Sequence, residues 1–95
     1  MRLDLFLKAS RLCPRRTQAQ ALCDAGAVSV GGAAARSSRA VRPGDEITIR
    51  RPPRTLVVRV LAVPATKQVA KADASALYEV LREEVADDSD DWATS

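Results

Sequence analysis

The first apolar positions of the chain recur with the spacing of a helix, i, i+3 and i+4: Leu3, Phe6 and Leu7. Residues with this spacing share one face of a helix, so we expect a helix that begins near Leu3 or Asp4. Pro14 disfavours helical backbone at the residue before it, and the helix should therefore end around residues 10–12.

A second helix is predicted to begin at Thr17, because Thr17 and Gln20 have the spacing of a capping box. Its buried stripe consists of three residues: Ala19, Leu22 and Cys23. Gly26 supplies a left-handed residue that ends the helix after about two turns. A helix this short depends on packing against the first helix for its stability.

After the second helix the apolar positions alternate with polar ones, which is the pattern of strands. This alternation predicts strands at residues 27–30 and 46–50, and the apolar, β-branched residues at 56–61 predict a third strand. Residues that favour turns separate them: Gly31-Gly32 and Pro43-Gly44-Asp45. The two prolines in the 51–54 loop keep the tip of the last hairpin out of the ladder.

The C-terminal third of the chain is predicted to add a helix and an acidic tail. A polar connector runs from residue 64 to about Lys71, and Asp73 then caps a helix. One side of that helix carries apolar residues: Leu77, Val80, Leu81 and Val85. Residues 87–91, Asp-Asp-Ser-Asp-Asp, lack any periodic pattern, so we expect residues 87–95 to form a disordered, solubilising tail.

Together these elements predict an α+β fold in the order α-α-β-β-β-α. Two N-terminal helices pack on a small, mainly antiparallel sheet, and a C-terminal helix follows. The 95 residues have room for one small domain, and no internal repeat occurs in them. We expect that domain over residues 1–63, the connector and C-terminal helix over residues 64–86, and the acidic tail over residues 87–95.

The net charge of +3 hides a strong asymmetry along the chain. Residues 1–60 contain twelve Arg and Lys residues and four acidic residues, a net charge of +8, whereas residues 61–95 carry −5. Eleven of the twelve cations are Arg, whose guanidinium binds phosphate through two parallel hydrogen bonds. The basic part favours a polyanionic partner, with a plain solvated Arg-rich surface as the alternative.

Missing residue types exclude several classes of chemistry. The chain has no His, and its two cysteines, Cys13 and Cys23, are too few for a four-cysteine zinc site. We expect both to be reduced, partly buried and inert, with a redox pair as the alternative. No phosphate-binding glycine loop or nucleophile elbow occurs, so we expect no enzyme, cofactor or metal site. No apolar run is long enough to span a bilayer and no signal peptide is evident, so we expect a cytoplasmic protein without membrane partners.

Basic residues stand at the starts of both N-terminal helices, where the helix dipole disfavours cations by about 0.3–1 kcal/mol each. Arg15 and Arg16 precede Thr17 and the second helix, and Arg2 precedes the first. A phosphate at the second helix would accept hydrogen bonds from first-turn N–H groups and from both arginines. These positions predict a site for a phosphate of the polyanionic partner, with arginines that simply face water as the alternative.

Other residues beside this candidate site have less defined roles. Asp4 either caps the first helix or orients the guanidinium of Arg2. Lys8 and Arg11 form either a solvated helix face or additional phosphate contacts. A segment of small residues over 36–42 carries further arginines suited to backbone contacts. The full set of candidate RNA-binding residues is Arg2, Asp4, Lys8, Arg11, Arg15, Arg16, Thr17, Gln18, Arg36 and Arg39.

The small number of aromatic residues indicates which form of nucleic acid is bound. The chain has three, Phe6, Tyr78 and Trp92, and Phe6 belongs to the buried stripe. Proteins that recognise single strands stack bases on several exposed aromatic rings. The target should therefore be the phosphate backbone of folded or double-stranded nucleic acid.

At these positions the sequence resembles the S-four (alpha-L) domain, an RNA-binding fold named after a small-subunit ribosomal protein. The resemblance rests on an ordered set of motifs: Arg2-Leu3-Asp4 with Phe6-Leu7, Arg15-Arg16-Thr17-x-Ala19-x-x-Leu22, Gly26-x-Val28-x-Val30 and Pro43-Gly44-Asp45-x-Ile47. Ala76-Leu77-Tyr78 extends it to nearly the whole chain. Two positions depart from the family pattern, since Cys13-Pro14 replaces an apolar and often a basic residue and Gly31-Gly32 replaces Asn-Gly.

The chain most resembles stand-alone members of this family that act on large ribosomal subunits. The nearer branch is that of the ribosome-quality-control P-site tRNA-stabilising factors, which hold peptidyl-tRNA in an obstructed large subunit while a partner factor tails the nascent chain. The resemblance implies a non-catalytic role, with large-subunit rRNA, P-site peptidyl-tRNA and the tailing factor as partners; we also expect a monomer. It places five residues on the rRNA-facing surface: Arg2, Asp4, Arg15, Arg16 and Thr17.

Three alternatives stay open. The second stand-alone branch comprises ribosome-associated heat-shock proteins, which bind large subunits that carry nascent-chain tRNA. The same domain also occurs as an accessory RNA-binding module of enzymes such as pseudouridine synthases and tRNA synthetases. The charge alone is equally compatible with a small DNA-binding or regulatory protein.

Overall fold

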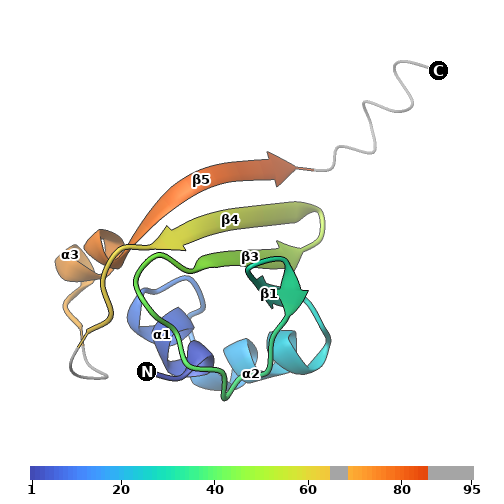
Figure 1. The fold of residues 1–95 in the computed structure, drawn as a ribbon, viewed down its shortest axis with the longest axis horizontal. Coiled ribbons are helices and arrows are strands. Elements are labelled where there is room, and N and C mark those ends of the chain that lie inside the picture. The colour runs from blue at the N-terminus through green and yellow to red at the C-terminus, as the bar shows by residue number, and fades with distance from the viewer. Residues whose placement is uncertain (65–68, 86–95) are drawn as a thin grey trace.

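Two short helices come first in the computed structural model, which describes residues 1–64 and 69–85. Helix α1 spans Leu3–Ala9 and helix α2 spans Arg16–Asp24, and both cover one face of a sheet (Figure 1). The apolar stripe predicted for α1 is confirmed, since its three residues are fully buried: Leu3, Phe6 and Leu7. Each large apolar side chain buried in this way contributes about 1.5–3 kcal/mol.

A residue with left-handed backbone, Arg11, follows the C-cap residue of helix α1, Ser10. The Ser10 N–H donates to the Phe6 carbonyl (2.8 Å), and the Arg11 N–H donates to the Lys8 carbonyl (3.0 Å). Arg11 has a φ of 62°, a conformation that Gly adopts readily and that costs other residues about 1–2 kcal/mol. The helix ends close to residues 10–12, as the position of Pro14 predicts. The chain leaves the helix through a strained backbone conformation at Arg11.

Replacing Arg11 by Gly should raise the free energy of unfolding by about 0.5–1 kcal/mol, because relief of the strain exceeds the entropy that Gly adds to the unfolded chain. Urea denaturation measures the change. Lys8→Gly is the matched control, since Lys8 is exposed inside α1 and Gly there should cost about 1 kcal/mol. A loss of stability in Arg11→Gly would show that the side chain matters more than the backbone.

Five antiparallel strands form one sheet in the order β2-β1-β3-β4-β5. Their bounds are Val28–Val30 (β1), Ala33–Ala34 (β2), Glu46–Arg51 (β3), Arg54–Val60 (β4) and Tyr78–Val85 (β5). The three predicted strands are thus confirmed to within two residues at each end. The turn predicted at Gly31 and Gly32 is also confirmed, with φ values of 61° and 87°. The two-residue strand β2 is too short for a periodic pattern to reveal it.

The predicted C-terminal helix is wrong. The described part of that segment begins with one helical turn, α3 (Lys71–Ala74), and a 3-10 turn, η1 (Ser75–Leu77). The chain then extends as β5 along the free edge of β4 (Figure 1). Asp73 lies inside α3 and does not cap it, because Ala70 is the N-cap residue.

The register of β5 explains why the spacing of its apolar residues predicts a helix. Val80 lies opposite Val58, and Arg82 lies opposite Val57, so Leu81 is the extra residue of a β-bulge. The bulge shifts the alternation by one residue, and the apolar positions acquire a helix-like spacing. The strand is stabilised by pairing with β4, which local spacing does not reveal.

The core lies between the two helices and the covered face of β1, β3 and β4. Its residues include Cys13 and Cys23, which are free thiols with 0% and 6% of their surface exposed. Burial raises the pKa of Cys13, and burial together with the nearby Asp4 carboxylate raises the pKa of Cys23 to about 11. Both thiols are therefore protonated at neutral pH and are poor nucleophiles, as expected.

Two predicted segments fall on residues that the structure does not describe. Part of the connector predicted over residues 64–71 and all of the tail predicted over residues 87–95 lie outside the described residues. Within residues 1–64 and 69–85, none of the helices has the length and apolar character needed to cross a membrane.

Candidate nucleic-acid interface

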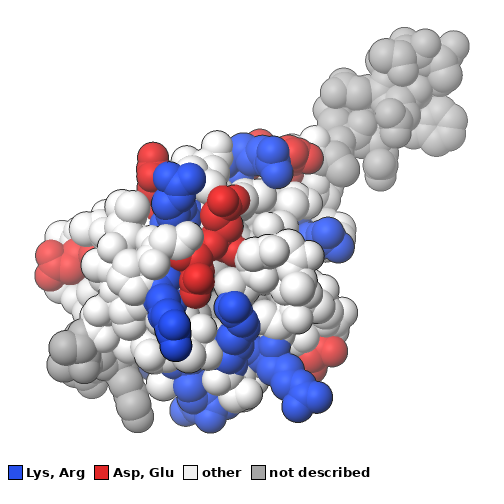
Figure 2. Space-filling model, in the orientation of Figure 1, with Lys and Arg blue, Asp and Glu red and all other residues white. Residues whose placement is uncertain are grey.

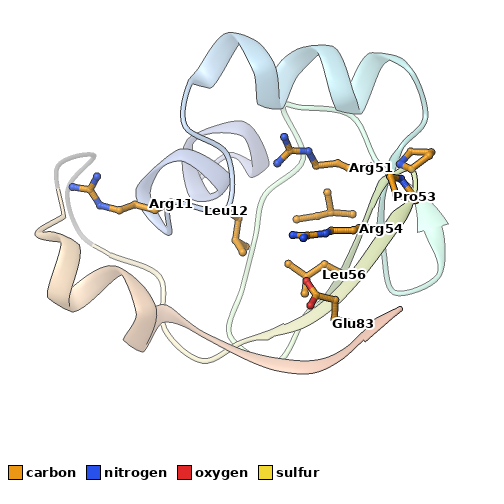
Figure 3. Close-up of a pocket in the computed structure, with 9 residues that line it drawn as sticks. Arg11, Leu12, Arg51, Pro53, Arg54, Leu56 and Glu83 are labelled. Carbon is orange, nitrogen blue, oxygen red and sulfur yellow. The ribbon is translucent and has the colours of Figure 1, made fainter. Parts of the chain in front are cut away.

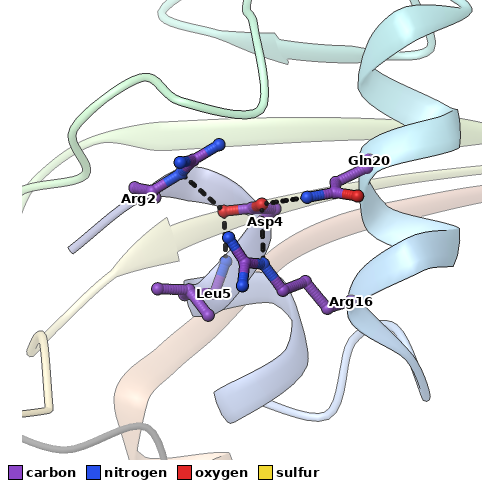
Figure 4. A network of polar contacts seen from close by, with 5 residues as sticks. All are labelled: Arg2, Asp4, Leu5, Arg16 and Gln20. Atoms are coloured by element: carbon purple, nitrogen blue, oxygen red, sulfur yellow. Dashed lines mark hydrogen bonds and ion pairs between the residues drawn. The ribbon is translucent and has the colours of Figure 1, made fainter.

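A buried carboxylate connects the starts of the two helices (Figure 4). Asp4, in the first turn of α1, has none of its surface exposed. One carboxylate oxygen accepts a hydrogen bond from the Leu5 N–H (2.8 Å) and lies 3.3 Å from Nε of Arg2. The other accepts hydrogen bonds from Nε of Arg16 (3.1 Å) and Nε2 of Gln20 (2.9 Å). Asp4 is not the N-cap residue of α1, which is Arg2, but it accepts a hydrogen bond from a first-turn N–H and contacts the guanidinium groups of Arg2 and Arg16.

Helix α2 supplies two of these donors from one face. Arg16 and Gln20 are four residues apart, so their side chains lie next to each other and both reach Asp4 on α1. The capping box predicted for Thr17 and Gln20 is wrong, because α2 begins at Arg16 and has Arg15 as an N-cap without a side-chain hydrogen bond. The Gln20 amide binds Asp4 instead of the backbone.

The environment of Asp4 keeps its carboxylate ionised. Burial alone would raise its pKa, but hydrogen bonds from Gln20, Arg16 and the Leu5 N–H, with the charge of Arg16, lower the pKa below its usual value. Because both guanidinium groups meet Asp4 through Nε, their terminal nitrogens stay available for another anion. The side chains of Arg2 and Arg16 are 46% and 40% exposed, so a phosphate can reach them.

The first-turn N–H groups of α1 are already occupied. The Leu3 N–H donates to the Arg39 carbonyl (2.8 Å), and the Asp4 N–H donates to the Ser37 carbonyl (3.1 Å). The backbone N–H groups of Leu3 and Asp4 are therefore not free to bind a phosphate. These two bonds instead fasten the 36–42 loop, with the exposed Arg36 and Arg39, beside the start of α1.

The start of α2 differs from that of α1. Its first backbone hydrogen bond runs from the Ala19 N–H to the Arg15 carbonyl (3.1 Å), and the N–H groups of residues 16–18 have no acceptor inside the helix. Arg15 and Thr17 are exposed, and Gln18 is half-buried. This end of α2 therefore offers both backbone donors and a guanidinium to an anion.

Most of the predicted residues lie on the helical layer or on the loop that crosses it. Figure 2 shows Lys and Arg side chains gathered in the lower part of the view, over α1, α2 and that loop. Lys8 is exposed in the last turn of α1, and Nη1 of Arg39 lies 4.0 Å from a carboxylate oxygen of Asp45. Arg11 does not join the Asp4 network; it lines a separate pocket beside the β3–β4 hairpin.

Sequence reasoning missed two features of the site. Gln20 was assigned to the helix cap, although its spacing of four residues from Arg16 was the available signal for a shared face. The closure of the α1 start by the carbonyls of Ser37 and Arg39 had no sequence signal, because backbone acceptors do not depend on residue type.

The charge balance keeps the site basic. Asp4 offsets one of the two guanidinium charges that it orients, so the group of Arg2, Asp4 and Arg16 retains a net charge of +1. Arg15 adds another, and in the part of the chain that the structure describes it forms no ion pair. Of the aromatic rings in that part, Phe6 is buried and Tyr78 half-buried, which disfavours base stacking.

A metal centre finds no support among the described residues. Over residues 1–64 and 69–85, no group of three Cys, Asp or Glu side chains is arranged to hold a metal ion. The arrangement of charges and exposed donors is instead suited to binding phosphate groups through hydrogen bonds.

Known proteins share both the sequence and the fold. The S4 domain family model matches residues 1–47. The RQC P-site tRNA stabilizing factor of Halalkalibacterium halodurans is 45% identical over 84 residues, which cover 88% of this chain and 93% of that protein. The factor of the same name from Bacillus subtilis is 43% identical over 84 residues, which cover 88% of this chain and 95% of that protein.

Solved structures agree with this assignment. The trimeric structure of Vibrio cholerae Heat Shock Protein 15 superposes with a TM-score of 0.76 at 26% identity, covering 84% of this chain and 80% of that one. The solution structure of a hypothetical protein also gives a TM-score of 0.76, at 32% identity, covering 88% of this chain and 100% of that one. By sequence and by fold, the chain belongs to the S4-domain family of RQC P-site tRNA stabilizing factors.

Proposed function

We propose that the chain is a non-catalytic factor that binds the large ribosomal subunit and stabilises P-site tRNA on it during ribosome-associated quality control. The names of relatives at 45% and 43% identity support this role. The observation that carries it is the Asp4 network, in which one buried carboxylate presents two arginines from different helices. Such an arrangement recognises phosphates at a fixed spacing and changes no covalent bond.

Binding would work through pre-organisation. A free Arg side chain loses rotamer freedom when it binds a phosphate, whereas Arg2 and Arg16 are already held at Nε by Asp4. Their terminal nitrogens, together with Arg15 and the N–H groups at the start of α2, would contact the backbone of a folded rRNA segment. The factor would then slow dissociation of tRNA by adding contacts to the complex.

The identity of each partner belongs to the same proposal. Large-subunit rRNA would bind the helical layer, peptidyl-tRNA would occupy the P site beside it, and a tailing factor would extend the nascent chain meanwhile. With these partners the protein would act in the cytoplasm. We propose that a monomer performs this task, although the Vibrio cholerae Heat Shock Protein 15 structure is trimeric.

A second candidate function is that of a heat-shock-type recycling factor for large subunits that carry nascent-chain tRNA. Its support is the TM-score of 0.76 with Heat Shock Protein 15. The higher sequence identity to the tRNA stabilizing factors favours the first candidate. Retention of peptidyl-tRNA on isolated large subunits distinguishes the two, because a stabilising factor increases it and a recycling factor does not.

Arg15→Ser should weaken co-sedimentation with large subunits that carry peptidyl-tRNA by about tenfold, since one phosphate contact is lost at an exposed position. The slope of log K against log salt concentration should also fall, by about 0.7–0.9 for each contact. Arg15 is preferable to Arg16 for this test, because reversing the charge of Arg16 would place a carboxylate against buried Asp4.

Arg50→Ser is the matched control for this experiment. Arg50 is exposed and carries the same charge, but it belongs to strand β3 and not to the start of a helix. Its variant should bind large subunits as the unchanged protein does. Equal binding by both variants and the unchanged protein would remove the start of α2 from the interface.

A further inference from the structure

A pocket outside the Asp4 network opens beside the β3–β4 hairpin (Figure 3). Its volume is about 420 Å³, within the range of sites that hold an amino-acid side chain or a small ligand. Apolar walls come from Leu12, Ile49 and Leu56, and Ile49 lies directly opposite Leu56 in the sheet. The pocket is therefore a continuation of the covered face of the sheet beyond the two helices.

Arginines surround these apolar walls. Arg51 and Arg54 are directly opposite each other at the closing pair of the hairpin, and both line the pocket. In Figure 3 both side chains extend from the hairpin into the pocket, and Arg11 stands on the far side of Leu12. Within the described residues neither Arg51 nor Arg54 forms an ion pair. Like charges placed opposite each other destabilise a hairpin, so an anion bound between them would remove a repulsion.

The ligand that fits must be both apolar and strongly acidic. Leu12 and Leu56 are half-buried, and an aromatic or aliphatic group that covered them would gain from their burial. Glu83 is the single acidic residue of the lining, which leaves a net positive charge around the pocket. These properties favour a peptide segment in which an aromatic residue follows several carboxylates.

The sequence that follows β5 has this composition. Strand β5 ends at Val85, which is paired with Arg54. The ten residues after it read Ala-Asp-Asp-Ser-Asp-Asp-Trp-Ala-Thr-Ser and contain four Asp residues followed by Trp92. Trp92 is the seventh residue after Val85, so the chain between them can span up to about 23 Å, enough to return over the pocket.

We propose that the acidic segment 86–95 docks on this pocket, with Asp carboxylates paired to Arg51 and Arg54 and the Trp92 ring against Leu12 and Leu56. The segment is attached at the edge of its site, so its effective concentration there reaches the millimolar range and modest contacts suffice. Docking covers basic groups that RNA would otherwise attract and confines RNA binding to the helical layer.

Trp92 is the one tryptophan of the chain, so its fluorescence reports on the segment directly. In the full-length protein its emission should lie at shorter wavelength, and acrylamide should quench it several-fold less, than in a synthetic peptide of residues 86–95. Raising the salt concentration to 1 M shortens the Debye length to about 3 Å and should move both values toward those of the peptide. Arg51→Ser/Arg54→Ser should do the same at low salt.

Arg50→Ser/Arg59→Ser is the matched control, because it removes two arginines from the same strands but none from the pocket lining. It should leave the emission of Trp92 unchanged. Emission and quenching identical to those of the free peptide would overturn the proposal. A second pair of results would also overturn it. If Trp92 of the unchanged protein emitted like the free peptide, and if Arg51→Ser/Arg54→Ser but not the control lost binding to an RNA oligonucleotide, the pocket would be a binding site for RNA.

Discussion

Asp4→Asn should weaken binding to the large subunit by about tenfold, although the change removes a negative charge from a basic surface. The reason is that the carboxylate holds Arg2 and Arg16 at Nε, at 3.3 and 3.1 Å. An amide presents one acceptor in place of two carboxylate oxygens and carries no charge, so both arginines regain rotamer freedom. Co-sedimentation at fixed ionic strength measures the loss.

The same substitution should lower the free energy of unfolding by about 2 kcal/mol, because Asp4 is buried and accepts charge-assisted hydrogen bonds. The pKa of Asp4 is below its usual value in the folded chain, so its ionised form stabilises the fold. This contribution is complete above the ordinary Asp pKa of about 4 and is lost as the pH falls through the lowered pKa. Urea titrations at neutral and acidic pH should therefore show the difference between the two proteins shrinking below pH of about 4.

Asp24→Asn is the control for both effects. Asp24 is an exposed residue at the end of α2, and its substitution changes the net charge by the same amount. It should leave stability within about 0.5 kcal/mol and should not weaken RNA binding. Tighter binding of Asp4→Asn to large subunits would contradict the prediction. It would mean that the increase in net positive charge affects the affinity more than the orientation of Arg2 and Arg16 does.

Phe6→Ala should lower the free energy of unfolding by about 3–5 kcal/mol, because Phe6 is a core residue with none of its surface exposed. A chain of 95 residues has a total stability of about 5–15 kcal/mol, so this one change removes a large share of it. Phe6→Leu conserves most of the volume and should cost less than about 1.5 kcal/mol, which keeps the series measurable. Equilibrium denaturation with both variants tests the packing.

Leu81→Ala provides the comparison at an exposed apolar residue. Leu81 is the bulged residue of β5 and is 36% exposed, so its truncation should cost less than about 1 kcal/mol. Similar losses in Phe6→Ala and Leu81→Ala would mean that α1 does not pack as described.

Local patterns were sufficient where the residues themselves determine the backbone. Leu3, Phe6 and Leu7 predicted the buried face of α1, and Gly31 with Gly32 predicted a turn that needs positive φ. Strand β3 followed from alternation, because one face of it is buried, and β4 followed from its run of apolar residues, Leu56 to Val58 with Val60. In these elements propensity, spacing and tertiary environment agree.

Contacts between residues far apart in the sequence explain the two wrong predictions, the C-terminal helix and the capping box. The apolar residues of β5 have the spacing of a helix. The segment is nevertheless a strand, because it pairs with the edge of β4, which is distant in sequence. Gln20 likewise matched a capping box locally, yet Asp4 of the other helix accepts its hydrogen bond. The candidate site was predicted as a set of arginines, but the carboxylate that organises two of them became evident only from the packing of α1 against α2.

The two edges of the sheet have a consequence for behaviour in concentrated solution. Strand β2 has two residues, and β5 at the other edge carries a bulge and a row of charged side chains: Glu79, Arg82, Glu83 and Glu84. Short strands, bulges and charges at an edge prevent the sheets of separate molecules from joining. Both edges of the sheet therefore disfavour fibril-like aggregation.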